Sequence, residues 1–121
     1  MQQRLTDDKS IYLQISQMIE TDILRGILLE EERVSSTNEL AKLYTINPAT
    51  AAKGVNILVD EGVLYKKRGI GMFVCAGATE KIRNRRKQAF YEIRLAELLG
   101  EAKSLGITKA ELIEQIEKEE K

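Results

Sequence analysis

The chain's single proline, Pro48, is the residue that most constrains its fold, because it follows Asn47 and precedes an apolar-periodic run. Proline lacks a backbone N–H, so it either interrupts a helix or occupies the first helical position, where that group has no partner anyway. Asparagine is a preferred N-cap residue. Val55 and Leu58 continue the apolar face, and Gly62 stands where a helix can end. The pattern predicts a helix that begins at Pro48.

A second helix is predicted directly before this one. Ser36 and Glu39 are spaced as a capping box, in which each side chain bonds to the other residue's backbone N–H. The helix is expected over residues 37–44, and "TIN" forms a short link to Pro48. Residues 37–61 are therefore predicted to form a helix-turn-helix.

The flanking segments extend this pattern on both sides. "SIYLQISQMIETDILRG" repeats apolar residues at three and four positions, which predicts an amphipathic helix capped by Ser10 and ended by Gly26. The runs "VLYKK" and "MFVC" enclose "RGIG" and predict a β-hairpin with glycines at positive φ. Three helices followed by a hairpin make a winged helix.

The remainder of the chain is predicted to be helical, with a last helix that starts at a second capping box, Thr108 and Glu111. The expected fold is mostly α with a small β-hairpin. We assign residues 1–76 to a winged helix-turn-helix domain and residues 77–121 to a short helical dimerisation segment.

Composition excludes several classes of function. The chain has no histidine and one cysteine, so the commonest general base and metal ligand are missing, and we expect neither an enzyme nor a metal or cofactor site. Cys75 lies in an apolar run and is interpreted as a small core residue, and the glutamates of "LLEEER" as a solvated turn. The N-terminus has no apolar h-region and no apolar stretch is long enough to span a membrane, so a cytoplasmic protein is expected.

The charge is unevenly distributed although the net charge is zero. Residues 40–94 carry eleven basic and four acidic side chains, whereas residues 1–39 carry four basic and eight acidic ones. A basic middle between acidic ends favours a local anionic partner.

The basic middle coincides with the expected helix-turn-helix and wing. The second helix of such a unit lies in the DNA major groove, and its N-terminal residues here are Asn47, Ala49, Thr50 and Lys53. The helix start at Ser36 and Thr37 suits phosphate binding. At the hairpin tip, Lys66, Lys67 and Arg68 lie beside glycines, as a wing that approaches the DNA backbone requires. Each feature also has a purely structural explanation, as a cap, an exposed helix residue or a solubilising turn, and their combination favours DNA.

The chain resembles the GntR family of transcriptional regulators, and most of all its short YtrA-type branch. The resemblance runs from Ser10 to Val74, through "IYLQI", "SSTNELA", "INPATAAK", "LVDEGVL" and "RGIGMFV". It implies a winged helix that binds operator DNA as a dimer and a short helical tail that dimerises. Thr50 matches the family's recognition-helix threonine, and Asn38 stands where an arginine is usual. The resemblance also places Arg68, Gly69 and Gly71 at the wing tip.

We therefore predict a homodimeric, sequence-specific regulator, most simply a repressor, on a double-stranded inverted-repeat operator. The expected subunit interface consists of apolar residues of the tail that are too few for an independent core: Phe90, Ile93, Leu98, Leu99, Leu112 and Ile116. The alternative is a winged-helix protein–protein interaction module without specific DNA binding, which the missing arginine and the zero net charge favour.

Overall fold

The computed structural model describes residues 10–120, so the polar N-terminal stretch interpreted above lies outside the described residues. The chain forms two compact units, the first up to Arg83 and the second from Asn84. Helix α4 (Ala78–Ala89) begins in the first unit and continues into the second. The predicted domain boundary after residue 76 stays a prediction.

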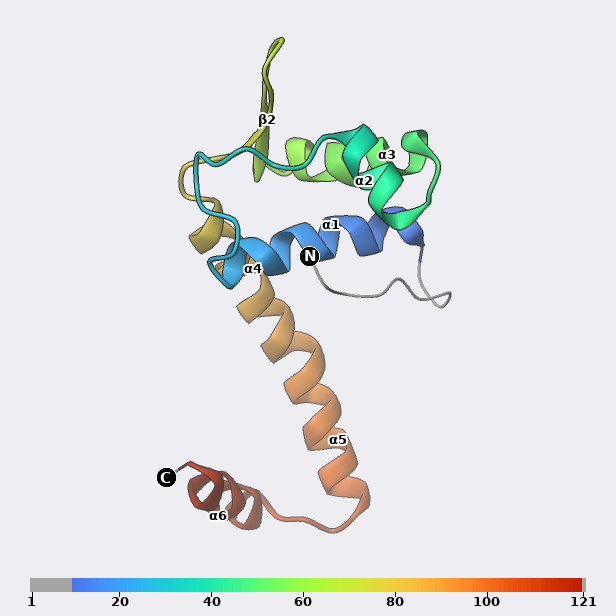
Figure 1. Ribbon diagram of the computed structural model, residues 1–121. Helices are drawn as coiled ribbons and strands as arrows, with labels where there is room; N and C mark the ends of the chain where they lie inside the picture. Colours follow the sequence, from blue (N-terminus) through green and yellow to red (C-terminus); the bar gives the residue numbers. More distant parts are fainter. Residues whose placement is uncertain (1–9, 121) are drawn as a thin grey trace. The chain divides into compact units, whose positions relative to one another are not determined.

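The first unit has the predicted order of elements (Figure 1). Helix α1 (Ile11–Leu24) is followed by α2 (Thr37–Tyr44) and α3 (Pro48–Asp60). Strands β1 (Leu64–Lys67) and β2 (Gly71–Val74) then pair in antiparallel register, with Leu64 opposite Val74 and Lys67 opposite Gly71. The hairpin projects away from the helices of this unit (Figure 1). The prediction of a mostly helical winged helix with one small hairpin is confirmed.

The local signals around α2 and α3 act as the sequence predicts. Pro48 is the first residue of α3, and the Asn47 Oδ1 accepts a hydrogen bond of 2.8 Å from the backbone N–H of Ala49. The backbone N–H of Glu39 donates to the Ser36 Oγ at 3.0 Å, and the N–H of Ser36 donates to the Glu39 carboxylate at 2.7 Å. The proline therefore starts a helix.

Helix α1 differs from the prediction at its N-terminal cap. Ser10 occupies the N-cap position, but its side chain makes no capping hydrogen bond. A capping hydroxyl would accept a hydrogen bond from the backbone N–H of Leu13. This N–H instead donates to the Ser10 carbonyl oxygen at 3.1 Å. At the other end, Gly26 has φ of 76°, the left-handed conformation expected where this helix ends.

The core of the first unit is aliphatic. Ile15, Ile19 and Ile23 form the buried face of α1. The other fully buried large side chains lie elsewhere in this unit, and they are Leu40, Leu58, Val63, Leu64, Val74 and Ile82. Cys75 is half-buried against this cluster, which agrees with its interpretation as a small core residue.

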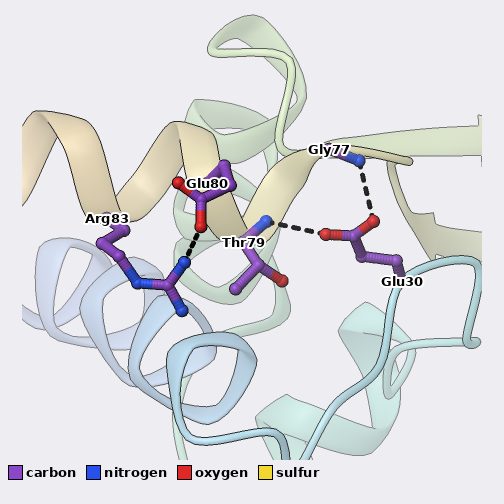
Figure 2. A network of polar contacts seen from close by, with 5 residues as sticks. All are labelled: Glu30, Gly77, Thr79, Glu80 and Arg83. Atoms are coloured by element: carbon purple, nitrogen blue, oxygen red, sulfur yellow. Dashed lines mark hydrogen bonds and ion pairs between the residues drawn. The ribbon is translucent and has the colours of Figure 1, made fainter.

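The acidic loop between α1 and α2 is exposed, as expected of a solvated turn, yet its glutamates also bind neighbouring segments. The Glu30 carboxylate accepts hydrogen bonds from the backbone N–H groups of Gly77, at 2.8 Å, and Thr79, at 3.1 Å, at the start of α4 (Figure 2). These bonds, above all the one from Gly77, lower the pKa of Glu30. Glu80, the residue after Thr79, pairs with Arg83 one turn further along α4 (Figure 2). Glu30 thus ties the loop to the first turn of α4.

The second unit consists of helices joined by a short turn over its described residues. A π-helix, η1 (Phe90–Leu95), leads into α5 (Ala96–Ser104), and α6 (Lys109–Glu119) follows. The predicted capping box of the last helix is confirmed, since the Thr108 Oγ1 accepts from the N–H of Glu111 at 3.1 Å. The π-helix was not predicted, because apolar spacing identifies a helix without distinguishing an occasional wider turn.

Candidate nucleic-acid interface

The N-terminal end of α3 presents the residues that the sequence predicts to face base edges. Asn47 and Ala49 are exposed, and Thr50 is half-buried. Asn47 already uses its Oδ1 to cap the helix, which leaves its amide NH₂ as the group available to a ligand. This end of α3 therefore offers hydrogen-bond donors on a fixed helical frame.

Lys53, in the second turn of α3, supplies the positive charge of this surface. Its side chain is exposed, and its Nζ lies 4.1 Å from the centroid of the Tyr12 ring on α1. This distance is within the range of a cation–π interaction. The sequence prediction singled out Lys53 but not Tyr12, which lies 41 positions earlier in the chain and has no local pattern that connects the two.

The start of α2 is partly occupied by its own capping box. The Glu39 carboxylate accepts the N–H of Ser36, and this bond lowers the pKa of Glu39. The N–H groups of Thr37 and Asn38, at the first two helical positions, have no intrahelical partner. Thr37 and Asn38 are therefore better placed than Ser36 to donate backbone hydrogen bonds to a phosphate.

The hairpin carries the predicted basic tip. Lys67 and Arg68 are exposed, and Gly69 adopts φ of 77°, which only glycine adopts without strain. The Lys67 Nζ lies 4.6 Å from the centroid of the Phe73 ring. That ring stacks on Tyr65 of the other strand, with centroids 5.9 Å apart. The two rings pack together on the strands, and the cationic side chains of Lys67 and Arg68 lie at the tip of the hairpin.

Arg33 is a basic residue at this surface that the sequence analysis missed, because it follows three glutamates in the acidic part of the chain. It forms an isolated antiparallel bridge with Phe73, which places the loop beside strand β2. Its guanidinium lies 3.6 Å from the Glu39 carboxylate. Its Nε lies 3.0 Å from the position that a Cβ on Gly71 would occupy. Arg33 thus lies between strand β2 of the wing and the start of α2, and Gly71 leaves room for it.

The residues predicted for the subunit interface are exposed in the second unit. Phe90, Ile93, Leu98, Leu99 and Ile116 each expose between 46% and 58% of their surface, and Leu112 is half-buried. Among the described residues of this unit, Ala102 alone is buried. The unit therefore has almost no core of its own.

Residues 10–120 contain no group of three or more His, Cys, Asp or Glu side chains arranged to hold a metal ion. They also contain no helix that is long and apolar enough to cross a membrane.

Comparison with known proteins identifies the family. The family model described as bacterial regulatory proteins, gntR family, matches residues 11–74. The arabinose metabolism transcriptional repressor of Halalkalibacterium halodurans is 40% identical over 67 residues, which cover 55% of this chain and 18% of that protein. The HTH-type transcriptional repressor YtrA of Bacillus subtilis is 29% identical over 106 residues, which cover 88% of this chain and 81% of that protein.

Solved structures agree with this match. A GntR-family regulator from Bacteroides thetaiotaomicron superposes with a TM-score of 0.76 at 35% identity, over 89% of this chain and 94% of that one. The DNA-binding domain of AraR, solved in complex with operator ORX1, superposes with a TM-score of 0.53 at 29% identity. That match covers 62% of this chain and 92% of the AraR domain.

Proposed function

The chain belongs to the gntR family of bacterial regulatory proteins, and on this premise we propose that it is a transcriptional repressor that binds an inverted-repeat operator as a homodimer. As the sequence predicted, its family and relatives are transcription regulators and not enzymes. The observation that carries the proposal is that the open end of α3 and the basic hairpin tip belong to one compact unit. We place its activity in the cytoplasm, where bacterial DNA is accessible.

In the proposed complex, the N-terminal end of α3 enters the major groove. Thr50 contacts a base edge or a thymine methyl group, and Lys53 contacts guanine or a phosphate. Lys53 is the only basic residue of α3, so direct contacts to bases are few. Each good contact discriminates by about 1–3 kcal/mol, so selectivity depends on two half-sites and on DNA shape.

The wing supplies contacts that do not depend on sequence. Lys67 and Arg68 project from the hairpin tip, and Gly69 lets the backbone approach the DNA closely. Basic side chains at such a tip neutralise phosphates, which gives affinity and sets the position of α3. Arg33 lies beside strand β2 of the same hairpin, but its ion pair with Glu39 offsets its charge, so the tip residues supply the positive charge of the wing.

The second unit supplies the dimer in this proposal. Its large apolar side chains are exposed in the single chain, and exposed apolar side chains in this number favour an interaction site. The occupant we propose is a second copy of the chain, because a symmetric pair buries the same residues on both partners and presents two copies of α3 to an inverted repeat.

Selection from a random duplex library tests this function, followed by fluorescence anisotropy of the selected duplex across a salt series. An enriched inverted repeat whose affinity falls steeply as salt rises supports the proposal. Sedimentation velocity on the same protein is expected to show a dimer. Weak binding without enrichment would contradict the proposal and favour the protein–protein interaction module.

A further inference from the structure

Lys53 contacts an aromatic ring, and this contact does not follow from the family match or from the names of the relatives. The Lys53 Nζ lies over the Tyr12 ring, 4.1 Å from its centroid. Lys53 comes from α3 and is exposed, whereas Tyr12 comes from the first turn of α1 and is half-buried. A side chain of the supporting helix therefore touches the charged end of a side chain on the helix proposed to enter the DNA groove.

The position of Tyr12 is fixed by close packing of α1 against α3. A Cβ on Gly54, the residue after Lys53, would lie 2.7 Å from the Tyr12 carbonyl oxygen and 3.1 Å from the Ile15 side chain. The Ser16 Oγ donates a hydrogen bond of 2.5 Å to the Gly54 carbonyl oxygen. The two helices are thus locked together next to Lys53, which fixes the backbone from which the Tyr12 ring projects.

From this geometry we propose that Tyr12 is a positioning residue that orders the Lys53 ammonium for contact with DNA. The inference rests on the proposed function and deepens it. A lysine has a long flexible stem, and ordering that stem opposes binding unless it is already ordered in the free protein. A contact with an aromatic face provides this order and leaves N–H donors of the ammonium for a phosphate or a base.

A ring is also a better support for this purpose than a carboxylate. An acidic partner would hold Lys53 equally well, but it would neutralise the charge and compete with the phosphate. Tyr12 attracts the cation through its electron-rich face and carries no charge of its own. The wing has the same arrangement, in which Lys67 lies 4.6 Å from the Phe73 ring centroid. The pairing of a proposed DNA-binding lysine with an aromatic face thus occurs twice in one unit.

A double-mutant cycle on the full chain tests the proposal, using anisotropy with the selected duplex and with a random duplex. Tyr12→Phe keeps the ring and is expected to bind like the wild type. Tyr12→Leu removes it and is expected to weaken binding about twofold to fivefold, the range for an exposed cation–π contact. In a Lys53→Ala background, Tyr12→Leu is expected to have no further effect. If Tyr12→Leu does not fold, Tyr12→Met is used in its place.

The control separates positioning from folding. Lys42→Ala removes an exposed lysine from the last turn of α2, and Tyr12→Leu is expected to weaken binding by the same factor with or without it. A purely structural role for Tyr12 would lower the melting temperature and weaken binding equally in the Lys53→Ala background, which would overturn the inference. Unchanged or tighter binding by Tyr12→Leu would also overturn it. Wild-type protein that binds neither duplex would instead refute the proposed function and the inference together.

Discussion

Ser16 on α1 donates a hydrogen bond from its Oγ to the backbone carbonyl oxygen of Gly54 on α3, at 2.5 Å. Ser16 is buried, so this bond forms inside the helix–helix contact. Gly54 permits the approach, because a Cβ there would lie 2.7 Å from the Tyr12 carbonyl oxygen. The contact sets where α3 lies on α1, and therefore how α3 is presented to DNA.

Gly54→Ala is expected to destabilise the first unit, although alanine normally favours a helix. The added Cβ meets backbone that cannot move without separating α1 from α3, and overpacking of this kind costs about 1–3 kcal/mol. Urea unfolding measures the change in the free energy of unfolding. Gly100→Ala is the matched control, because nothing lies within 4 Å of its added Cβ and α5 gains helix propensity. Equal effects of the two substitutions would contradict this account of Gly54.

The contact at Gly54 shows which features of this fold the sequence predicts and which it does not. Helix caps depend on residues within three positions of one another, so Ser36 with Glu39 and Asn47 with Pro48 were identified correctly. The contact of Ser16 with Gly54 joins residues 38 positions apart. Only the packing of the helices brings such residues together. The contact of Tyr12 with Lys53 depends on the same packing, so no local sequence pattern predicts it. The predicted DNA-contacting residues were found through local signals, but the residues that support them were not.

Asn47→Ala is expected to lower the free energy of unfolding by about 1 kcal/mol, the usual effect of losing an N-cap side chain. The Asn47 Oδ1 accepts the N–H of Ala49, and alanine leaves that donor without its partner. Asn47→Ser keeps a capping oxygen and is expected to retain stability in urea unfolding. Serine lacks the amide NH₂, so anisotropy of this variant reports whether Asn47 also contacts DNA. Full affinity would limit Asn47 to its capping role.

Glu30→Gln is expected to reduce stability at neutral pH and to flatten its dependence on acid pH. The hydrogen bonds from Gly77 and Thr79 lower the pKa of Glu30 below its ordinary value of 4.5. A carboxylate whose pKa is lowered by folding stabilises the protein above its unfolded pKa, and this stability is lost as pH falls through the folded pKa. The pH dependence of stability is measured as the melting temperature of each protein between neutral and acid pH. Glu97→Gln is the control for losing an exposed carboxylate. Parallel curves for Glu30→Gln and wild type would exclude a role for the Glu30 carboxylate.

Arg68→Ala and Thr50→Ala are expected to affect DNA binding in different ways. Arg68 lies at the exposed wing tip, so its loss should weaken binding to selected and random duplexes alike and reduce the salt slope by about one. Thr50 lies at the start of α3, so its loss should change the preference among sequences by about 1–3 kcal/mol at one position of the site. Anisotropy with both duplexes across a salt series separates the two effects. The assigned roles would be wrong if both variants lost affinity equally for both duplexes.

Phe90→Glu is expected to convert the proposed dimer into a monomer. Phe90 exposes 53% of its surface in the single chain, so a charge there leaves the folded unit almost unaffected, whereas burying that charge between two copies is unfavourable. Sedimentation velocity should show a smaller species with an unchanged circular dichroism spectrum. Affinity for the inverted repeat should fall while affinity for a single half-site stays the same, since each winged helix is intact. Lys103→Glu, a charge change at an exposed polar position of α5, is expected to remain dimeric. A Phe90→Glu protein that still sediments as a dimer would place the interface elsewhere on the chain.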